Sequence, residues 1–159
     1  MSKYLILWGY YLPIFGSLLW AAVRDVKTHK IPNKYTAALA VYSLLSIPVR
    51  SIAQSRLWDA VSLPNLAADA LLGGLLGGGM LLLVSVLTKG GFGGGDTKLM
   101  AGLGLAFGVF GAVSILFLAV EFTVYVGLIQ RKYGKKGRLP FAPFLFVGCA
   151  ITAYFLRLF

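Results

Sequence analysis

Five apolar runs, separated by short basic, polar or glycine-rich segments, dominate the sequence. The runs are Tyr4–Val23, Tyr35–Val49, Leu66–Leu87, Leu99–Ile129 and Phe141–Leu158. A helix of about 20 apolar residues spans the ~30 Å hydrocarbon core of a bilayer. Hydrophobic residues make up 58% of the 159 residues and charged residues only 13%, about half the charged share of soluble domains. A soluble core of this size could not bury so much apolar surface, so the sequence predicts an integral membrane protein.

The fourth run decides the number of spans. As one helix, residues 97–129 would be about 50 Å long at ~1.5 Å per residue, so we expect two helices with a turn between Gly108 and Gly111. Six spans put eleven of the fifteen Lys and Arg residues on one side, whereas five would divide them seven to eight. The positive-inside rule favours the asymmetric arrangement. We therefore expect residues 1–159 to form a single all-α domain, a polytopic bundle of about six transmembrane helices with both termini on the non-cytoplasmic side.

The net charge of +10 follows mainly from this topology. The basic segment Arg131–Arg138 is interpreted as an anchor in contact with anionic lipid, and nucleic-acid binding is not favoured. With Cys149 as the only cysteine and His29 as the only histidine, a multi-cysteine zinc site and Ser-His-Asp chemistry are poorly supported. We expect no metal ion or other cofactor, and we expect Cys149 to be a buried small side chain.

Two sets of glycines lie at G-x-x-x-G spacing: Gly73, Gly74, Gly77 and Gly78 in the third run, and Gly104 with Gly108 in the fourth. Small residues at this spacing let two helix backbones approach closely within a membrane. We therefore predict that these glycines serve helix packing.

The glycine-rich segment before Asp96 has a different character. Five of the six residues from Gly90 to Gly95 are glycines, which is excessive for packing. The spacing fits neither a P-loop nor a dinucleotide-binding loop, and a carboxylate at Asp96 would repel a phosphate.

Only five acidic residues are present: Asp25, Asp59, Asp69, Asp96 and Glu121. The predicted topology puts Asp25 and Asp96 at the cytoplasmic ends of two spans, at one membrane depth. Two carboxylates that share a site cannot both ionise easily, so one keeps a proton while the other activates water, as in aspartic proteases. The neighbouring glycines would admit an extended peptide close to Asp96.

Position alone leaves other interpretations open. Asp25 could pair with Arg24 or Lys27, and Asp96 could cap a helix and pair with Lys98. A small ion-coupled transporter or channel could instead use Asp25, Asp96 and the intramembrane Glu121 to handle a cation.

The remaining acids are expected to have no catalytic role. Asp59 and Asp69 fall on the outer side, where Asp69 would belong to the first turn of its helix. Glu121 stays unexplained within a span, apart from pairing with a neighbouring helix.

Three motifs resemble those of the type IV prepilin peptidase family, which are membrane aspartyl proteases with a G-x-G-D motif. The segment from Gly93 to Asp96 continues as T-K-L-M-A-G-L-G and is similar to the family pattern G-x-G-D-x-K-[LF]-x-A-x-x-G. Asp25 resembles the first family aspartate, because it precedes a short basic segment that ends with I-P-N. The stretch L-P-F-A-P-F-L, from Leu139 to Leu145, resembles the proline-rich start of the family's last helix.

The resemblance implies an aspartic-type endopeptidase of the cytoplasmic (inner) membrane. It would cut prepilins or pseudopilins between a basic leader and a hydrophobic helix, at the cytoplasmic face. The residues implied as catalytic are Asp25 and Asp96, and those implied as supporting are Gly93, Gly95, Lys98, Pro32 and Asn33. The implied partners are prepilin proteins and the lipid bilayer. A catalytically inactive membrane protein of pilus assembly remains an alternative.

Longer family members carry a cytosolic insertion with paired C-x-x-C zinc ligands and N-methyltransferase activity. This sequence has one cysteine and lacks room for that insertion. It therefore resembles the short, peptidase-only form found in tight-adherence (Flp) pilus systems.

Two local expectations concern the aspartates and the I-P-N segment. Asn33 is expected to be the N-cap of the second helix, with Pro32 fixing the preceding turn. Asp25 lies at a helix C-terminus, while Asp96 precedes a helix N-terminus. We therefore expect Asp96 to be the ionised base and Asp25 its protonated partner.

Overall fold

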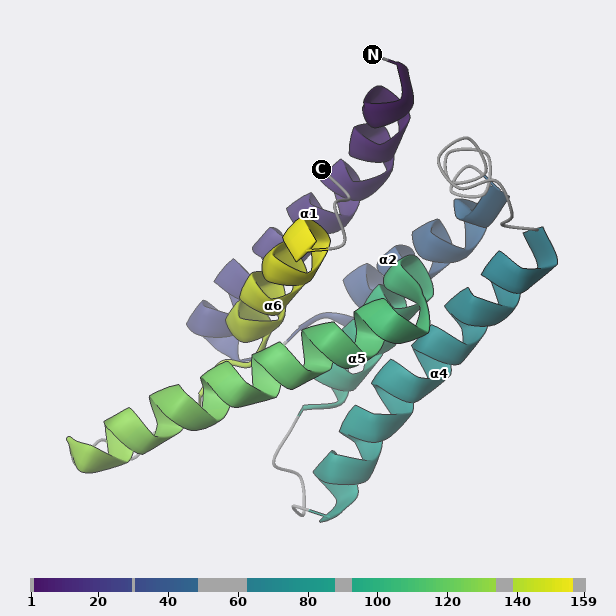
Figure 1. The fold of residues 1–159 in the computed structure, drawn as a ribbon. Coiled ribbons are helices and arrows are strands. Elements are labelled where there is room, and N and C mark those ends of the chain that lie inside the picture. Colours follow the sequence, from purple (N-terminus) through teal and green to yellow (C-terminus); the bar gives the residue numbers. More distant parts are fainter. Residues whose placement is uncertain (1, 30, 49–62, 88–92, 134–138, 156–159) are drawn as a thin grey trace.

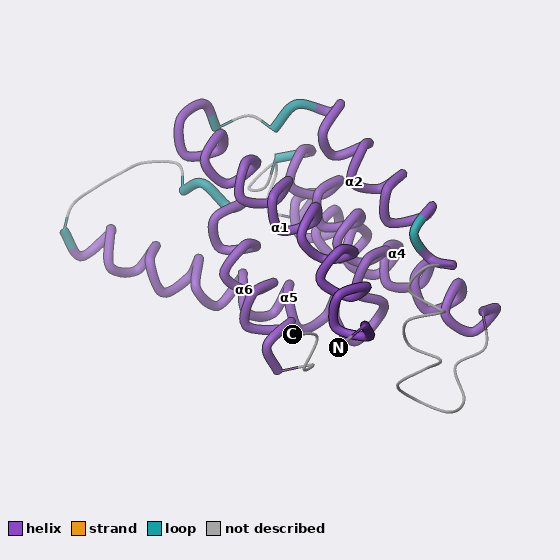
Figure 2. The backbone as a smooth tube through the Cα atoms, turned by 90° about the horizontal axis from the view of Figure 1, so that it is seen from above, coloured by secondary structure: helices purple, strands orange, loops and turns teal. Residues whose placement is uncertain are grey.

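The computed structural model describes residues 2–29, 31–48, 63–87, 93–133 and 139–155. These residues form five helices and no strand (Figures 1 and 2). The helices are α1 (Ser2–Thr28), α2 (Asn33–Leu45), α4 (Leu63–Leu87), α5 (Gly94–Lys132) and α6 (Ala142–Phe155). The all-α class is therefore confirmed for the described part of the chain.

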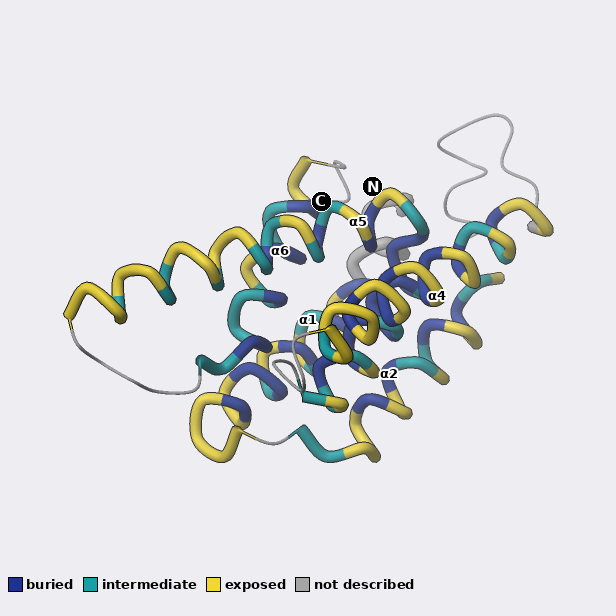
Figure 3. The backbone as a smooth tube through the Cα atoms, turned by 90° about the horizontal axis from the view of Figure 1, so that it is seen from below, coloured by how far each residue is buried: buried dark blue, intermediate teal, exposed yellow. Residues whose placement is uncertain are grey.

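Two of these helices are long and apolar enough to cross a membrane. They are Pro64–Leu87 within α4 and Gly94–Lys132, while Ala142–Phe155 is apolar but shorter. Large apolar side chains of both helices are exposed, including Leu75 and Phe117. Figure 3 marks many exposed residues along α4 and α5. Such faces suit contact with lipid. The number of spans and the orientation of the termini stay predictions.

Helix α5 is broken at Gly108. This residue has φ 74° and ψ −171°, a left-handed conformation that glycine adopts without a steric penalty. The ribbon of α5 changes direction part-way along its length (Figure 1). The break lies within the Gly108–Gly111 stretch where the sequence predicts a turn.

A side chain from α4 holds this break. The backbone N–H of Val109, the first residue after Gly108, donates a hydrogen bond of 3.0 Å to Oδ1 of Asp69. The first N–H groups of a helix have no partner within the helix, so Asp69 caps the second segment of α5. The sequence predicts no more for Asp69 than a place in its own helix.

The glycines at G-x-x-x-G spacing bring α4 and α5 into close contact, as predicted. A Cβ atom added to Gly73 would overlap the backbone of Gly104 and Gly108. One added to Gly78 would lie 2.8 Å from Cβ of Ala101. Only glycine therefore fits at these crossing points.

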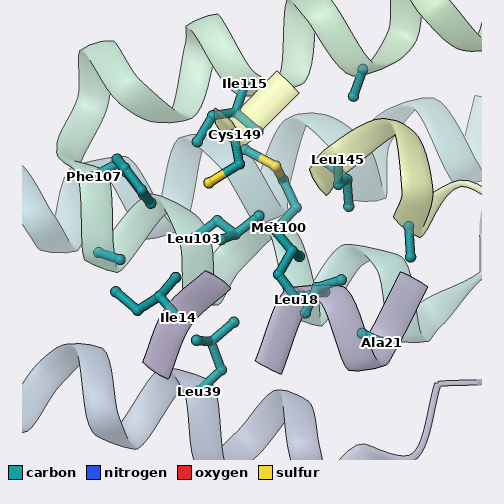
Figure 4. Close-up of a cluster of buried hydrophobic side chains, with 14 of the residues drawn as sticks. Ile14, Leu18, Ala21, Leu39, Met100, Leu103, Phe107, Ile115, Leu145 and Cys149 are labelled. Carbon is teal, nitrogen blue, oxygen red and sulfur yellow. The ribbon is translucent and has the colours of Figure 1, made fainter. Parts of the chain in front are cut away.

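The hydrophobic core lies where α1, α2, α5 and α6 meet (Figure 4), and Leu81 of α4 also belongs to it. Its fully buried side chains include Ile14 and Leu18 of α1, Leu103 of α5, and Leu145 of α6. Cys149 is also fully buried, which confirms the expectation of a small side chain in the core.

Polar groups within the core connect three helices. The Tyr10 hydroxyl donates to the carbonyl of Ala106 at 3.1 Å, and the Tyr42 hydroxyl donates to the carbonyl of Tyr10 at 3.1 Å. Ser43 Oγ donates to the carbonyl of Gly102 at 3.2 Å. These bonds fix α1 and α2 against the first segment of α5, the segment that begins with Asp96.

Candidate active site

Asp25 lies in the last turn of α1 and is 5% exposed. It continues the buried face of that helix, because Ile14, Leu18 and Ala21 precede it at spacings of three or four residues. The helix ends directly afterwards, at Thr28, and His29 has φ 50°. The sequence therefore places a carboxylate at the C-terminal end of an apolar helix face.

Asp96 lies in the first turn of α5 and is 9% exposed. Leu99, Met100 and Leu103 follow on the same buried face. Asp96 Oδ2 accepts a hydrogen bond of 3.3 Å from the backbone N–H of Gly93, the N-cap residue. Asp96 is thus the third residue of α5, so the expectation that it precedes the helix and is its N-cap is wrong. Its contact with the Gly93 N–H orients the carboxylate.

Both aspartates line one cavity of about 550 Å³. Its walls come from the end of α1, the connection to α2 and the start of α5. The lining residues are Arg24, Asp25, Thr28, His29, Ile31, Pro32, Asn33, Gly93, Gly94, Gly95 and Asp96. The structure thus brings together six of the seven site residues that the sequence indicates.

The seventh, Lys98, joins two walls of this cavity. Its Nζ donates a hydrogen bond of 3.0 Å to Oδ1 of Asn33. At the same interface, a Cβ atom on Gly95 would lie 3.0 Å from Cβ of Ile31. Gly95 therefore lets the start of α5 pack closely against the I-P-N segment.

The expectation that Asn33 caps α2 is wrong. The N-cap is Pro32, with φ −65° and ψ 134°, and Asn33 is the first helical residue. Proline fits there because its backbone prefers this extended conformation. The Asn33 side chain is directed across to Lys98 instead of along its own helix.

The basic residues next to the aspartates have other contacts. The Arg24 guanidinium lies 5.2 Å from the ring centroid of Trp20, and that ring lies 3.8 Å from the ring of Tyr35 in α2. The donor that reaches Asp25 is a backbone group, the N–H of Ala142 at the start of α6, with a distance of 3.0 Å to Oδ2.

Sequence reasoning missed several residues of the site. Arg24, Thr28 and His29 line the cavity, and their place follows from the last turn of α1. Nothing in the local pattern indicated the contact of Ala142 with Asp25, because the two are 117 residues apart.

The other acids lie elsewhere or outside the described residues. Glu121 is exposed on the second segment of α5 and does not line the cavity. Asp59 and the segment Gly134–Arg138 of the basic anchor fall outside the described ranges. Within those ranges, no cluster of three or more His, Cys, Asp or Glu side chains could hold a metal ion.

Two buried aspartates on separate helices thus line one cavity, each at the end of an apolar helix face. The sequence matches the type IV leader peptidase family over residues 12–128. This chain belongs to that family.

Two curated proteins illustrate the relationship. The chain is 33% identical over 153 residues to the prepilin leader peptidase/N-methyltransferase of Bacillus subtilis (strain 168), and the match covers 89% of this chain and 53% of that protein. It is 32% identical over 130 residues to leader peptidase HopD of Escherichia coli, with 76% of each protein covered. The chain thus spans about half the length of the Bacillus relative. No solved structure matches it.

Proposed function

We propose that this protein is an aspartic-type endopeptidase that removes the basic leader from type IV prepilins at the cytoplasmic face of the cell membrane. The observation that carries the proposal is the shared cavity of Asp25 and Asp96. Membership of the leader peptidase family supports it, as do the names of both relatives.

The reaction needs one water molecule and both carboxyl groups. The ionised aspartate accepts a proton from water while the water oxygen attacks the carbonyl carbon of the scissile peptide bond. The protonated aspartate donates to the carbonyl oxygen. Collapse of the tetrahedral intermediate breaks the C–N bond, and the departing nitrogen takes up a proton. The products are a leader with a new carboxylate and a mature chain with a new amino group.

Within the family, we assign the protein to the short, peptidase-only form that serves Flp-like pili. The motifs around Asp25 and Asp96 support the peptidase, and the presence of one cysteine leaves no paired zinc ligands of the C-x-x-C kind in this sequence. We expect the protein to cut its substrate without methylating the new N-terminus.

The test is co-expression with a Flp-like prepilin, with leader removal followed by gel shift. Asp25→Asn and Asp96→Asn should each lower cleavage by about 100-fold or more, because each removes one acid–base group. The amount of membrane protein should stay the same in an immunoblot. Glu121→Gln is the matched control, because it neutralises an exposed acid outside the cavity, and it should cleave normally.

Undiminished processing in either aspartate variant would overturn the proposal. Absence of processing together with cation uptake that depends on Glu121 would favour the transporter, and absence of both would favour the inactive assembly protein. Mass spectrometry of the mature N-terminus tests the methylation claim, since a methylated product formed by this chain alone would contradict it.

A further inference from the structure

The first turn of α6 touches a catalytic carboxylate. The backbone N–H of Ala142 donates a hydrogen bond of 3.0 Å to Oδ2 of Asp25. Both partners are buried, with Asp25 5% exposed and Ala142 0% exposed. A hydrogen bond from a backbone N–H to a carboxylate is strengthened by the charge and by exclusion of water.

The local sequence leaves this N–H group available. The first N–H groups of a helix have no partner within the helix, and Ala142 is the first residue of α6. Pro143 follows and has no N–H. The next two N–H groups, of Phe144 and Leu145, both donate to the carbonyl of Phe141. The start of α6 therefore directs the N–H of Ala142 to Asp25.

We propose that the N–H of Ala142 is a positioning group for catalysis, because it fixes the orientation of the Asp25 carboxyl group at the cavity. This inference rests on the proposed peptidase function. It makes the start of α6 part of the active site, although the Ala142 side chain performs no chemistry.

The sharpest test removes the N–H and leaves the helix in place. Proline is favoured at the first position of a helix, so Ala142→Pro deletes the donor within a helix start, while its ring adds atoms at a fully buried position next to Asp25. Ala142→Gly is the matched control, because it keeps the N–H. Incorporation of lactic acid at position 142 replaces the N–H by an ester oxygen with the same side chain, and it keeps the test informative if the proline variant fails to fold.

The measurements are kcat and KM of prepilin cleavage in detergent. Loss of the hydrogen bond to the Asp25 carboxyl group predicts a fall in kcat of about 10- to 100-fold with an unchanged KM. Ala142→Gly should keep both constants of the unmodified protein.

Two outcomes would overturn the inference. A normal kcat in the folded proline or ester variant would show that the N–H has no role. A fall in kcat of the same size in Ala142→Gly, which keeps the N–H, would show that the side chain at this position matters instead. Failure of the peptidase proposal looks different, because the unmodified protein would then not cleave prepilin at all.

Discussion

The ammonium group of Lys98 donates a 3.0 Å hydrogen bond to the side-chain oxygen of Asn33, and so joins the start of α5 to the start of α2. Asn33 lines the cavity, and Lys98 follows Asp96 by two residues. The bond therefore connects the two walls between which a substrate would lie.

Loss of this bond should affect cleavage more than stability. The contact is exposed, so its contribution to the free energy of unfolding is about 1 kcal/mol or less. Lys98→Met and Asn33→Leu should each slow cleavage several-fold, and the double variant should be no slower than either one, because both remove the same bond. Lys34→Met, which neutralises an exposed neighbour, is the control. If the double variant slowed cleavage by the product of the two single effects, the Lys98–Asn33 bond would not be the cause of the slower cleavage.

The two glycines before Asp96 should respond differently to a methyl group. A Cβ atom on Gly95 would lie 3.0 Å from Cβ of Ile31 and 3.2 Å from its carbonyl oxygen, whereas one on Gly94 would have no neighbour within 4 Å. Gly95→Ala should therefore lower the free energy of unfolding by about 1–3 kcal/mol, and Gly94→Ala should leave it unchanged. Thermal unfolding in detergent measures both.

The cleavage rate of the Gly94→Ala variant then tests whether the substrate backbone passes close to this glycine. If the peptide backbone passes this glycine, as the peptidase proposal requires, cleavage should fall while the melting temperature stays constant. Equal melting temperatures for the two alanine variants would contradict the close packing of Gly95 against Ile31.

Helix α4 offers a matched pair for the packing of helices within the bundle. A Cβ atom added at Gly73 would overlap the backbone of Gly104, whereas one added at Gly79 would have no neighbour within 4 Å. Gly73→Ala should destabilise the protein by more than about 2 kcal/mol, because backbone atoms cannot move aside as a flexible side chain can. Gly79→Ala should be neutral or slightly stabilising. A Gly73→Ala variant that unfolds at the normal temperature would contradict the close approach of α4 and α5.

The cap at the break in α5 should contribute to stability and not to chemistry. Asp69→Ala removes the acceptor for the Val109 N–H, and loss of such a cap costs about 0.5–2 kcal/mol. Asp69→Asn keeps a side-chain oxygen and should cost less. Both variants should cleave prepilin at the normal rate per folded molecule, because Asp69 does not line the cavity. A loss of cleavage without a loss of stability would instead assign Asp69 a role in the reaction.

Much of the fold could be predicted from the sequence, because its signals are local. Apolar runs mark the helices, the length of residues 97–129 requires a break, and glycine at position 108 allows it. The position of Asp25 and Asp96 at one cavity was predictable as well, since each stands where an apolar helix face ends at a basic or glycine-rich segment.

The contacts that refine the site could not be predicted, because each joins residues far apart in the sequence. Asn33 is a residue type that often caps helices, yet its side-chain oxygen accepts a hydrogen bond from Lys98 on another helix. Asp69 binds the backbone of α5, and Asp25 binds the backbone of α6. Residue spacing along one helix contains no information about which backbone group of a second helix will face it.

The row of Arg24, Trp20 and Tyr35 beside the cavity has a practical consequence. Arg24 lines the cavity, its guanidinium lies over the Trp20 indole, and that indole lies 3.8 Å from the Tyr35 ring at an angle of 32°. Indole emission depends on the charges and rings next to it, so a peptide that displaced Arg24 would change the fluorescence of Trp20. Trp20 is one of three tryptophans in the sequence, so a variant that keeps Trp20 alone would report whether the cavity is occupied.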